Sequence, residues 1–470
     1  MNMEIKALHF DLKSMNPTAE YALILIDEFA ELGINAIVLE FEDKFPFTAT
    51  AGTHHHCCWS KEEFRAFASR CREKKIELIP LLQSVGHLDY LLKHPRFHDL
   101  RDGGPQGTSY QWCLSREDSF ALWCAMVDEL LETFSGTTIS HIGADECRMD
   151  VNCERCGPAM FDRYIERVAR CCRYIQDKDI KVILWDDVFR KYGVDKISLL
   201  PPGVVPCIWM YSKLDEDYID RMAASGLELW GASRIQNNKF FHALSPHRPV
   251  MWNVDAWGRV LQKYPQFTGH IGTVWGRSQC QSPLKSVLPP AMFMVAYLAE
   301  TLTHGVIQDK SGFITGFGEK FFGIKLDYNT MINCFCEEPD FVAPLAFELK
   351  ENALRHRDIA EIWYTFNLID KLMVYIHSCF SFHDCMLNSY REGTVSGEII
   401  AKRQKGVERC QKETLRMLAE LKPVMMKYFP EKMWDEFVNQ RFAAKLEQNQ
   451  QWKAVLEDAA LKWQEHLRKR

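Results

Sequence analysis

Two textures of hydrophobic and polar positions alternate along the first two thirds of the chain. Short runs rich in β-branched and aromatic residues are separated by longer stretches in which apolar residues recur at helical spacing. Strands that alternate with helices are typical of a parallel sheet built from repeated βα units. The predicted strands lie near Ile5–Leu12, Ile34–Phe41, Ile76–Gln83, Thr138–Gly143, Val182–Asp186, Val204–Trp209, Leu227–Gly231 and Ile271–Trp275, and crossover helices are predicted at Ala19–Leu32, Lys61–Lys75, Ser119–Phe134 and Met160–Asp177.

Eight such strands fit either an open doubly wound sheet or a closed barrel. The open sheet usually carries a glycine-rich phosphate turn after its first strand. Here the first strand ends in His9-Phe10-Asp11-Leu12-Lys13, which has no such turn. The sequence therefore predicts an α/β fold with a (β/α)8 TIM barrel, and in such a barrel the functional residues follow the C-terminal ends of the strands.

The texture changes from about Ser282 onward, where no further β-rich runs occur. Long helical patterns follow at Asp358–Asn388, Ser396–Lys422 and Glu431–Arg470. The stretch Ser282–His304 predicts the last helix of the barrel, and the glycines of Gly305–Gly323 predict a joint. We therefore expect a barrel catalytic domain over residues 1–305 and a C-terminal helical domain over residues 306–470.

Composition and charge narrow the possible partners. Hydrophobic residues make up 47% of the chain and charged residues 26%, which is typical of a globular protein with a large core. The net charge of -6 supplies no positive field for nucleic acid or anionic lipid, so neither is an expected partner. Since Met1–Asp11 lacks the pattern of a secretory signal and no long apolar run is present, we expect a cytoplasmic protein.

Two adjacent carboxylates, Asp145 and Glu146, follow the predicted strand Thr138–Gly143 directly. Neighbouring carboxylates repel each other's charge, so one of them can keep its proton near neutral pH. An Asp-Glu pair is by itself ordinary in a chain with 63 acidic residues. Its place at a strand end, after small residues that let a ligand approach the backbone, favours catalysis.

The segment His141-Ile142-Gly143-Ala144-Asp145-Glu146 resembles the His-x-Gly-Gly/Ala-Asp-Glu signature of glycoside hydrolase family 20, the β-N-acetylhexosaminidases. The resemblance is strongest to the hexosaminidase D-like branch and covers roughly residues 5–290. Because the matches recur at successive strand ends, they fit the geometry of a barrel. The further matching segments are His9–Lys13, Gly33–Ala36, Glu40–Pro46, Gln83–Leu88, Leu184–Asp187 and Trp275–Arg277.

This resemblance implies a retaining, exo-acting hydrolase without a protein nucleophile, in which the substrate's own 2-acetamido group attacks the anomeric carbon. Glu146 is the implied general acid and base, and Asp145 the residue that orients the acetamido group and steadies the oxazolinium. The implied substrate is a small glycoside ending in N-acetylgalactosamine or N-acetylglucosamine, and the branch favours N-acetylgalactosamine. No cofactor is implied.

Several strand-end residues are candidates for binding the sugar. Trp185, Trp209 and Trp275 can form an aromatic wall, and the resemblance assigns Tyr211 to the acetamido oxygen. Many family members carry an Arg at the first strand end and a Trp-x-Glu at the last, which this chain lacks, so recognition of the other hydroxyls is expected to differ. Either Asp186 or Asp187 faces the site. The predicted set is Asp11, His87, Trp185, Asp187, Trp209, Tyr211, Asn253, Trp275 and Arg277.

The cysteines raise the question of a metal. Most of the 17 cysteines lie in apolar helical contexts and are expected to be buried free thiols. The run His54–Cys58 and the residues Cys147, Cys153 and Cys156 follow two strands on the same predicted face. A single Cys-x-x-Cys is a weak zinc signal. We therefore expect no metal, with a structural zinc at those three cysteines as the minor alternative.

Two other functions remain open from the sequence. A family 123 β-N-acetylgalactosaminidase also uses a neighbouring Asp-Glu pair, although the Gln83–Leu88 and His141–Glu146 segments argue against it. A barrel that has lost catalysis and serves as a sugar-binding or scaffold protein is the alternative from a different class. The amphipathic C-terminal helices are compatible with a homodimer.

Overall fold

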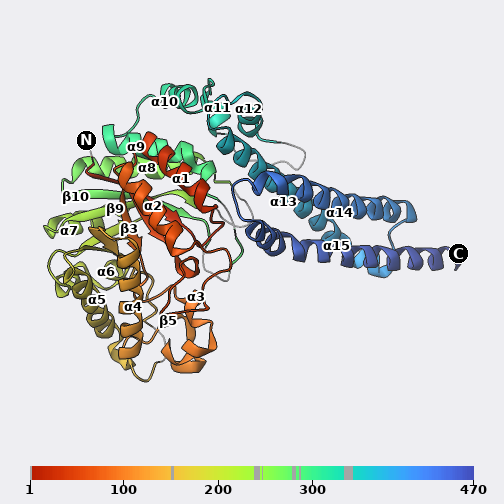
Figure 1. The fold of residues 1–470 in the computed structure, drawn as a ribbon. Helices are drawn as coiled ribbons and strands as arrows, with labels where there is room; N and C mark the ends of the chain where they lie inside the picture. The colour runs from red at the N-terminus through yellow and green to blue at the C-terminus, as the bar shows by residue number, and fades with distance from the viewer. Residues whose placement is uncertain are drawn as a thin grey trace. The chain divides into compact units, whose positions relative to one another are not determined.

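The computed structural model describes residues 3–149, 153–237, 244–245, 247–277, 282–284, 287–332 and 342–469. Figure 1 traces the chain from the N-terminal strands to the C-terminal helices. The chain divides into two compact units. The first comprises Met1–Asn237, His247–Ser282 and Ala291–Phe313, and the second comprises Asn238–Pro246, Pro283–Pro290 and Ile314–Arg470.

The first unit is a closed barrel of eight parallel strands in the order β1-β10-β9-β8-β7-β6-β3-β2, which confirms the predicted fold. β1 pairs with β10 from Ile5 opposite Gly269 to Leu8 opposite Gly272, and this pairing closes the barrel. Apolar side chains from alternate positions fill the interior. The strands are β1 Ile5–Asp11, β2 Ala36–Glu40, β3 Glu77–Leu81, β6 Ile139–His141, β7 Lys181–Trp185, β8 Val205–Trp209, β9 Leu229–Asn237 and β10 Phe267–Trp275.

Helices follow the barrel strands, and the four predicted crossover helices each begin and end within two residues of their predicted bounds. Local signals fix these bounds: Ser60 and Glu63 form a reciprocal capping box at the start of α2, for example. The helices of this unit are α1 Ala19–Glu31, α2 Lys61–Glu73, α3 Asp89–Leu92, α4 Glu117–Thr133, α5 Met160–Gln176, α6 Asp187–Tyr192, α7 Glu216–Ala224, α8 His247–Lys263 and α9 Met292–His304.

The connection from β3 to β6 contains a structure that the sequence did not predict. After α3, the strands β4 (Arg101–Asp102) and β5 (Thr108–Trp112) pair antiparallel in a separate two-stranded sheet. Figure 1 draws α3 and β5 in the same orange part of the chain. This small sheet follows a barrel strand at its C-terminal end, so it can contribute residues to the mouth of the barrel.

The second unit is helical, as predicted from the change of texture. Its main elements are α13 (Arg357–Glu392), α14 (Gly397–Met425) and α15 (Glu431–Arg468), which pack against one another; the Phe366 and Phe437 rings lie 5.8 Å apart. The predicted joint at Gly305–Gly323 is largely helical and holds α10 (Lys310–Phe317) and a π-helical turn at Gly318–Phe322. The shorter helices are α11 Tyr328–Ile332 and α12 Pro344–Asn352. Over the described residues, none of the helices combines the length and apolar character that crossing a bilayer requires.

Candidate active site

The chain leaves β6 through a strained turn that presents the two carboxylates. Gly143, Ala144 and Glu146 have φ values of 63°, 71° and 49°, in the left-handed region that non-glycine residues rarely adopt. A Cβ at Gly143 would lie 1.8 Å from Oε1 of Gln83, so only glycine fits there. Strain of this kind persists where the surroundings enforce it, and it concentrates at functional sites.

Asp145 and Glu146 open onto a cavity of about 310 Å³ at the mouth of the barrel, a size at the lower end of the range for small-ligand sites. Its walls combine charged, amide and aromatic side chains from seven of the barrel's strand ends. The lining residues are Lys13, Glu40, Gln83, His87, Asp145, Glu146, Trp185, Trp209, Tyr211, Trp275 and Arg277.

His87 bridges the two carboxylates. Its Nε2 atom lies 3.3 Å from Oδ2 of Asp145 and 3.4 Å from Oε2 of Glu146. The Tyr110 hydroxyl lies 3.0 Å from the same Nε2 atom and donates to Oε2 of Glu146 at 3.4 Å. Tyr110 comes from β5, the strand that the sequence did not predict, so no strand-end pattern could have indicated it.

The charge distribution of this cluster differs from the expected one. Burial alone would lower the pKa of His87, but the charge of Asp145 and hydrogen bonds to both carboxylates raise it well above its ordinary value. The hydrogen bond from His87 lowers the pKa of Glu146. The raised pKa of His87 and the lowered pKa of Glu146 place a proton on His87 rather than on Glu146.

The pKa of Asp187 is raised, unlike that of Glu146. Its burial, followed by the nearby charge of Asp145, raises the pKa of Asp187 to about 7. Its Oδ2 atom accepts the backbone N–H of Glu146 at 2.9 Å, and its Oδ1 atom accepts the indole N–H of Trp209 at 3.4 Å. Asp186 instead accepts the backbone N–H of Trp209 at 3.2 Å, so Asp187 is the member of the pair that adjoins the site.

Aromatic side chains form one side of the cavity. Trp185 is 1% exposed, and its ring lies 6.4 Å from that of Trp275 between centroids. The Trp209 and Tyr211 rings are 5.3 Å apart. The Trp275 indole N–H donates to the Tyr211 hydroxyl at 3.0 Å, which holds the two side chains together. This arrangement offers flat apolar faces on which a sugar ring can stack.

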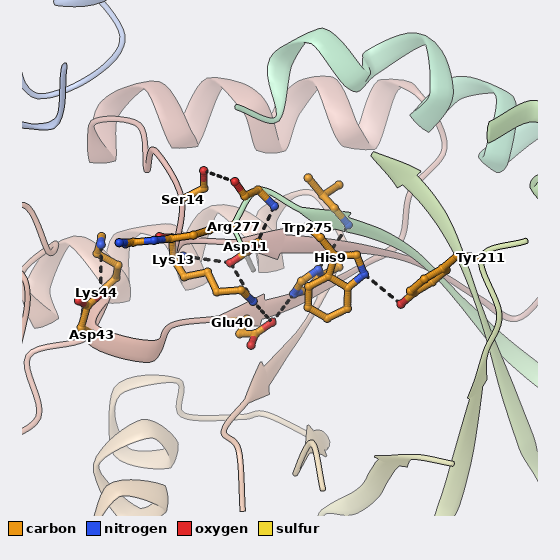
Figure 2. A network of polar contacts seen from close by, with 12 residues as sticks. His9, Asp11, Lys13, Ser14, Glu40, Asp43, Lys44, Tyr211, Trp275 and Arg277 are labelled. Atoms are coloured by element: carbon orange, nitrogen blue, oxygen red, sulfur yellow. Dashed lines mark hydrogen bonds and ion pairs between the residues drawn. The ribbon is translucent and has the colours of Figure 1, made fainter. Parts of the chain in front are cut away.

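Opposite charges at the ends of β1 and β2 form a buried network (Figure 2). Nζ of Lys13 lies 3.0 Å from Oε2 of Glu40 and 3.4 Å from Oδ1 of Asp11, and 4.6 Å from the centroid of the Trp275 ring. His9 contacts the same Glu40 oxygen at 2.8 Å. Lys13, Glu40 and Asp11 are all less than 10% exposed.

Pairing keeps Lys13 and Glu40 charged despite their burial, whereas burial raises the pKa of Asp11. Burial raises the pKa of Glu40, but Lys13 and His9 lower it by more, and the pKa ends well below its ordinary value. Burial likewise lowers the pKa of Lys13, and the carboxylates Asp11 and Glu40 raise it by more. Lys13 and Glu40 therefore present a fixed cation and a fixed anion to the cavity.

The predicted site residues fall into three groups. Most of them line the cavity, whereas Asp11 and Asp187 support lining residues from behind. Asn253 does not line it. This buried amide accepts the backbone N–H of Arg234 at 3.1 Å and donates to the Met210 carbonyl at 2.9 Å, so its hydrogen bonds are made to the backbone. The lining residues absent from the predicted set are Lys13, Glu40 and Gln83, although each lies within a matching segment at a strand end.

Only part of the predicted cysteine set comes together. Cys153 and Cys156 lie beside Cys113 and Asp102, whereas Cys147 stands outside this group. His55, His56 and Cys57 form a separate group. None of these residues lines the cavity, and the chemistry available inside the cavity is that of carboxylates, an imidazole, an ammonium group and aromatic rings.

Hexosaminidases are among the known proteins to which this chain is similar. No family model matches the chain. It is 26% identical to hexosaminidase D from Bos taurus over 344 residues, 68% of this chain and 97% of that protein, and 26% identical to hexosaminidase D from Homo sapiens over 326 residues, 64% of this chain and 66% of that one. A solved β-N-acetylhexosaminidase from Bacteroides fragilis NCTC 9343 superimposes with a TM-score of 0.53 at 16% identity, covering 68% of this chain and 69% of that one, which supports the barrel fold.

The buried network makes Lys13 important for stability. We predict that Lys13→Met lowers the free energy of unfolding by about 3–5 kcal/mol, because it leaves Glu40 and Asp11 buried without their cation. Denaturant unfolding measures the effect. Lys263→Met, which removes a solvent-exposed pair with Asp220, is the matched control and should cost no more than about 1 kcal/mol. Equal costs for the two variants would contradict the proposed burial of charge.

The raised pKa of Asp187 predicts a pH-dependent stability. Between the ordinary carboxyl pKa of 3.8 and about 7, the folded state keeps a proton that the unfolded chain releases. The stability contributed by Asp187 is thus present at low pH and lost as the pH rises. We expect the unfolding free energy of the wild type, minus that of Asp187→Asn, to fall over this range. Denaturant titrations at several pH values, with Asp220→Asn as control, measure it, and a constant difference would count against the raised pKa.

Proposed function

Because this chain belongs to the hexosaminidase D-like branch of glycoside hydrolase family 20, we propose that it is an exo-acting β-N-acetylhexosaminidase. It removes a terminal N-acetylgalactosamine or N-acetylglucosamine from a small glycoside, with retention of configuration. The observation that carries the proposal is the pair Asp145 and Glu146 at an aromatic-walled cavity of about 310 Å³. A cavity of this size suits one terminal sugar better than the interior of a polymer.

In this proposal Glu146 protonates the departing glycosidic oxygen and then accepts a proton from water. Its side chain is 53% exposed, and a hydrogen bond from His87 lowers its pKa. A bound sugar that excludes water from the cavity raises the pKa of a carboxyl by desolvation, which moves Glu146 toward the protonated form needed for the first step. His87 and Tyr110 contact the same Oε2 atom and orient the carboxyl.

Asp145 orients the 2-acetamido group and stabilises the oxazolinium that forms when its carbonyl oxygen attacks the anomeric carbon. Oδ2 of Asp145 lies against His87, while Oδ1 is buried and has no hydrogen-bond partner in the part of the chain that is described. A buried acceptor without a donor is costly, and the acetamido N–H is a donor that satisfies it. A fixed anion beside the developing positive charge needs little reorganisation.

The other lining residues select the sugar. The Trp185, Trp209 and Trp275 rings surround the acetamido methyl and the apolar face of the pyranose, and Tyr211 contacts the acetamido oxygen. Lys13 and Glu40 take the place of the family's arginine and bind ring hydroxyls by charge-assisted hydrogen bonds. We expect this cation and anion pair to favour the galacto epimer, in line with the branch of the family.

Hydrolysis of the p-nitrophenyl β-glycosides of N-acetylgalactosamine and N-acetylglucosamine tests the proposal. We predict that Glu146→Gln and Asp145→Asn each lower kcat/KM by about 10²–10⁴, because each removes a group that acts in the transition state. The exposed Glu132→Gln on α4 is the matched control and should keep wild-type activity. The ratio of the two substrates gives the sugar preference.

Two results would overturn the proposal. If the wild type binds these sugars without hydrolysing either from mildly acidic to neutral pH, the chain is a sugar-binding barrel that has lost catalysis. A disaccharide with a terminal 2-acetamido sugar has a poor leaving group, which must be protonated as it departs. If Glu146→Gln keeps wild-type activity on such a disaccharide, Glu146 is not the general acid. A normal thermal unfolding midpoint for each variant shows that any lost activity is not lost folding.

A further inference from the structure

Four buried side chains outside the cavity bring metal-ligand atoms together. Every ligand atom of the group lies within 4.8 Å of the others, and each residue is at most 5% exposed. Sγ of Cys113 lies 3.7 Å from Sγ of both Cys153 and Cys156. Two sulfurs bound to one tetrahedral zinc at about 2.3 Å lie about 3.8 Å apart. The group consists of Asp102, Cys113, Cys153 and Cys156.

Asp102 supplies an independent sign of a missing ligand. The residue is 0% exposed, and its Oδ2 atom accepts the side-chain N–H of Gln111 at 2.6 Å. Its Oδ1 atom is buried and accepts no hydrogen bond from an N–H or O–H group within the described residues; the neighbour of the carboxyl on this side is the Cys153 thiol. A carboxylate that binds a metal commonly has one oxygen held by a hydrogen-bond donor, while the other oxygen faces the metal. Asp102 has this arrangement, because Gln111 holds one of its oxygens and the other lies beside three thiols.

Hydrogen-bond donors surround the sulfurs. The backbone N–H of Ser115 hydrogen-bonds Cys113 and Cys156, and the N–H groups of Gly103 and Cys156 hydrogen-bond Cys153. The Ser115 hydroxyl donates to Sγ of Cys156 at 3.4 Å. Hydrogen bonds of this kind orient the sulfur ligands of a metal site. A disulfide is a poorer account, because a sulfur separation of 3.7 Å is far from a covalent bond and a third thiol would be left over.

We propose that this cluster of four side chains binds one Zn²⁺ in a tetrahedral site of three thiolates and one carboxylate. On binding, each thiol releases its proton to solvent. All four positions are filled by protein, and none of the four residues lines the cavity, so the metal is structural. This ligand set differs from the three cysteines that the sequence offered as the minor alternative for zinc, because Asp102 and Cys113 take the place of Cys147.

The site would hold together the segments around the carboxylates. Asp102 belongs to β4 and Cys113 follows β5, the strand that carries Tyr110, while Cys153 and Cys156 lie in the segment between Glu146 and α5. Gln111 already links these segments, because it also hydrogen-bonds the backbone of Arg148. A zinc ion here would fix Tyr110 against Glu146 from outside the cavity.

The test is the metal content of the full-length protein purified under reducing conditions with zinc present during expression. We expect about one zinc per chain that survives dialysis, loss of that zinc in Cys113→Ser and Cys156→Ser, and full retention in Cys147→Ser, a buried neighbour outside the cluster. Zinc retained by both cluster variants, or lost equally from Cys147→Ser, would overturn the ligand set. A wild type with all thiols reduced and no zinc would overturn the site itself.

Cobalt substitution keeps the proposal testable if the cluster variants do not fold. Wild-type protein depleted of zinc and loaded with Co²⁺ should show the strong visible absorption of tetrahedral cobalt together with a thiolate charge-transfer band. The weak spectrum of octahedral cobalt, or no change on adding Co²⁺, would contradict the site. Neither readout depends on hydrolytic activity, so the outcome is independent of the proposed function.

Discussion

The pairing of β1 with β10 is the constraint on which the rest of the site depends. It joins the two ends of the sheet, so the residue after β1 and the residues after β10 meet although more than 260 positions separate them in the sequence. The Asp11 carboxylate accepts the backbone N–H of Gly276, and Lys13 lies over the Trp275 ring. Closure thus turns separate strand ends into one cavity wall, and it buries charges that must then be paired.

Pairing of buried charge explains where the protons rest. Lys13 lies between Asp11 and Glu40, and this pairing keeps Lys13 and Glu40 charged away from water, whereas burial raises the pKa of Asp11. Around the proposed catalytic pair, His87 holds a proton between Asp145 and Glu146, and burial together with the charge of Asp145 raises the pKa of Asp187 to about 7. Asp145 thus presents an unused carboxylate oxygen to the cavity, and Asp187, behind the lining residues, holds the backbone N–H of Glu146.

The sequence predicted the barrel and most of the cavity because both follow from position along strands. Alternation of apolar runs located the eight strands, and strand ends located Trp185, Trp209 and Trp275. It could not predict Tyr110 or Cys113, because Tyr110 belongs to the small β4–β5 sheet and Cys113 follows it directly, and the short strands of this sheet carry no periodic pattern. It also assigned Asn253 to the sugar, whereas Asn253 hydrogen-bonds to the backbone of Met210 and Arg234. These bonds depend on tertiary packing, which periodicity does not encode.

The central claim is that the substrate's acetamido oxygen, steadied by Asp145, is the nucleophile. Hydrolysis of p-nitrophenyl glycosides whose N-acetyl methyl carries zero to three fluorine atoms tests this most directly. Fluorine withdraws electrons from the carbonyl oxygen without changing the leaving group. If this oxygen is the nucleophile, we expect kcat/KM to fall steeply with each fluorine. A rate that is independent of fluorination would show that the acetamido group takes no part in bond formation and would rule out substrate-assisted catalysis.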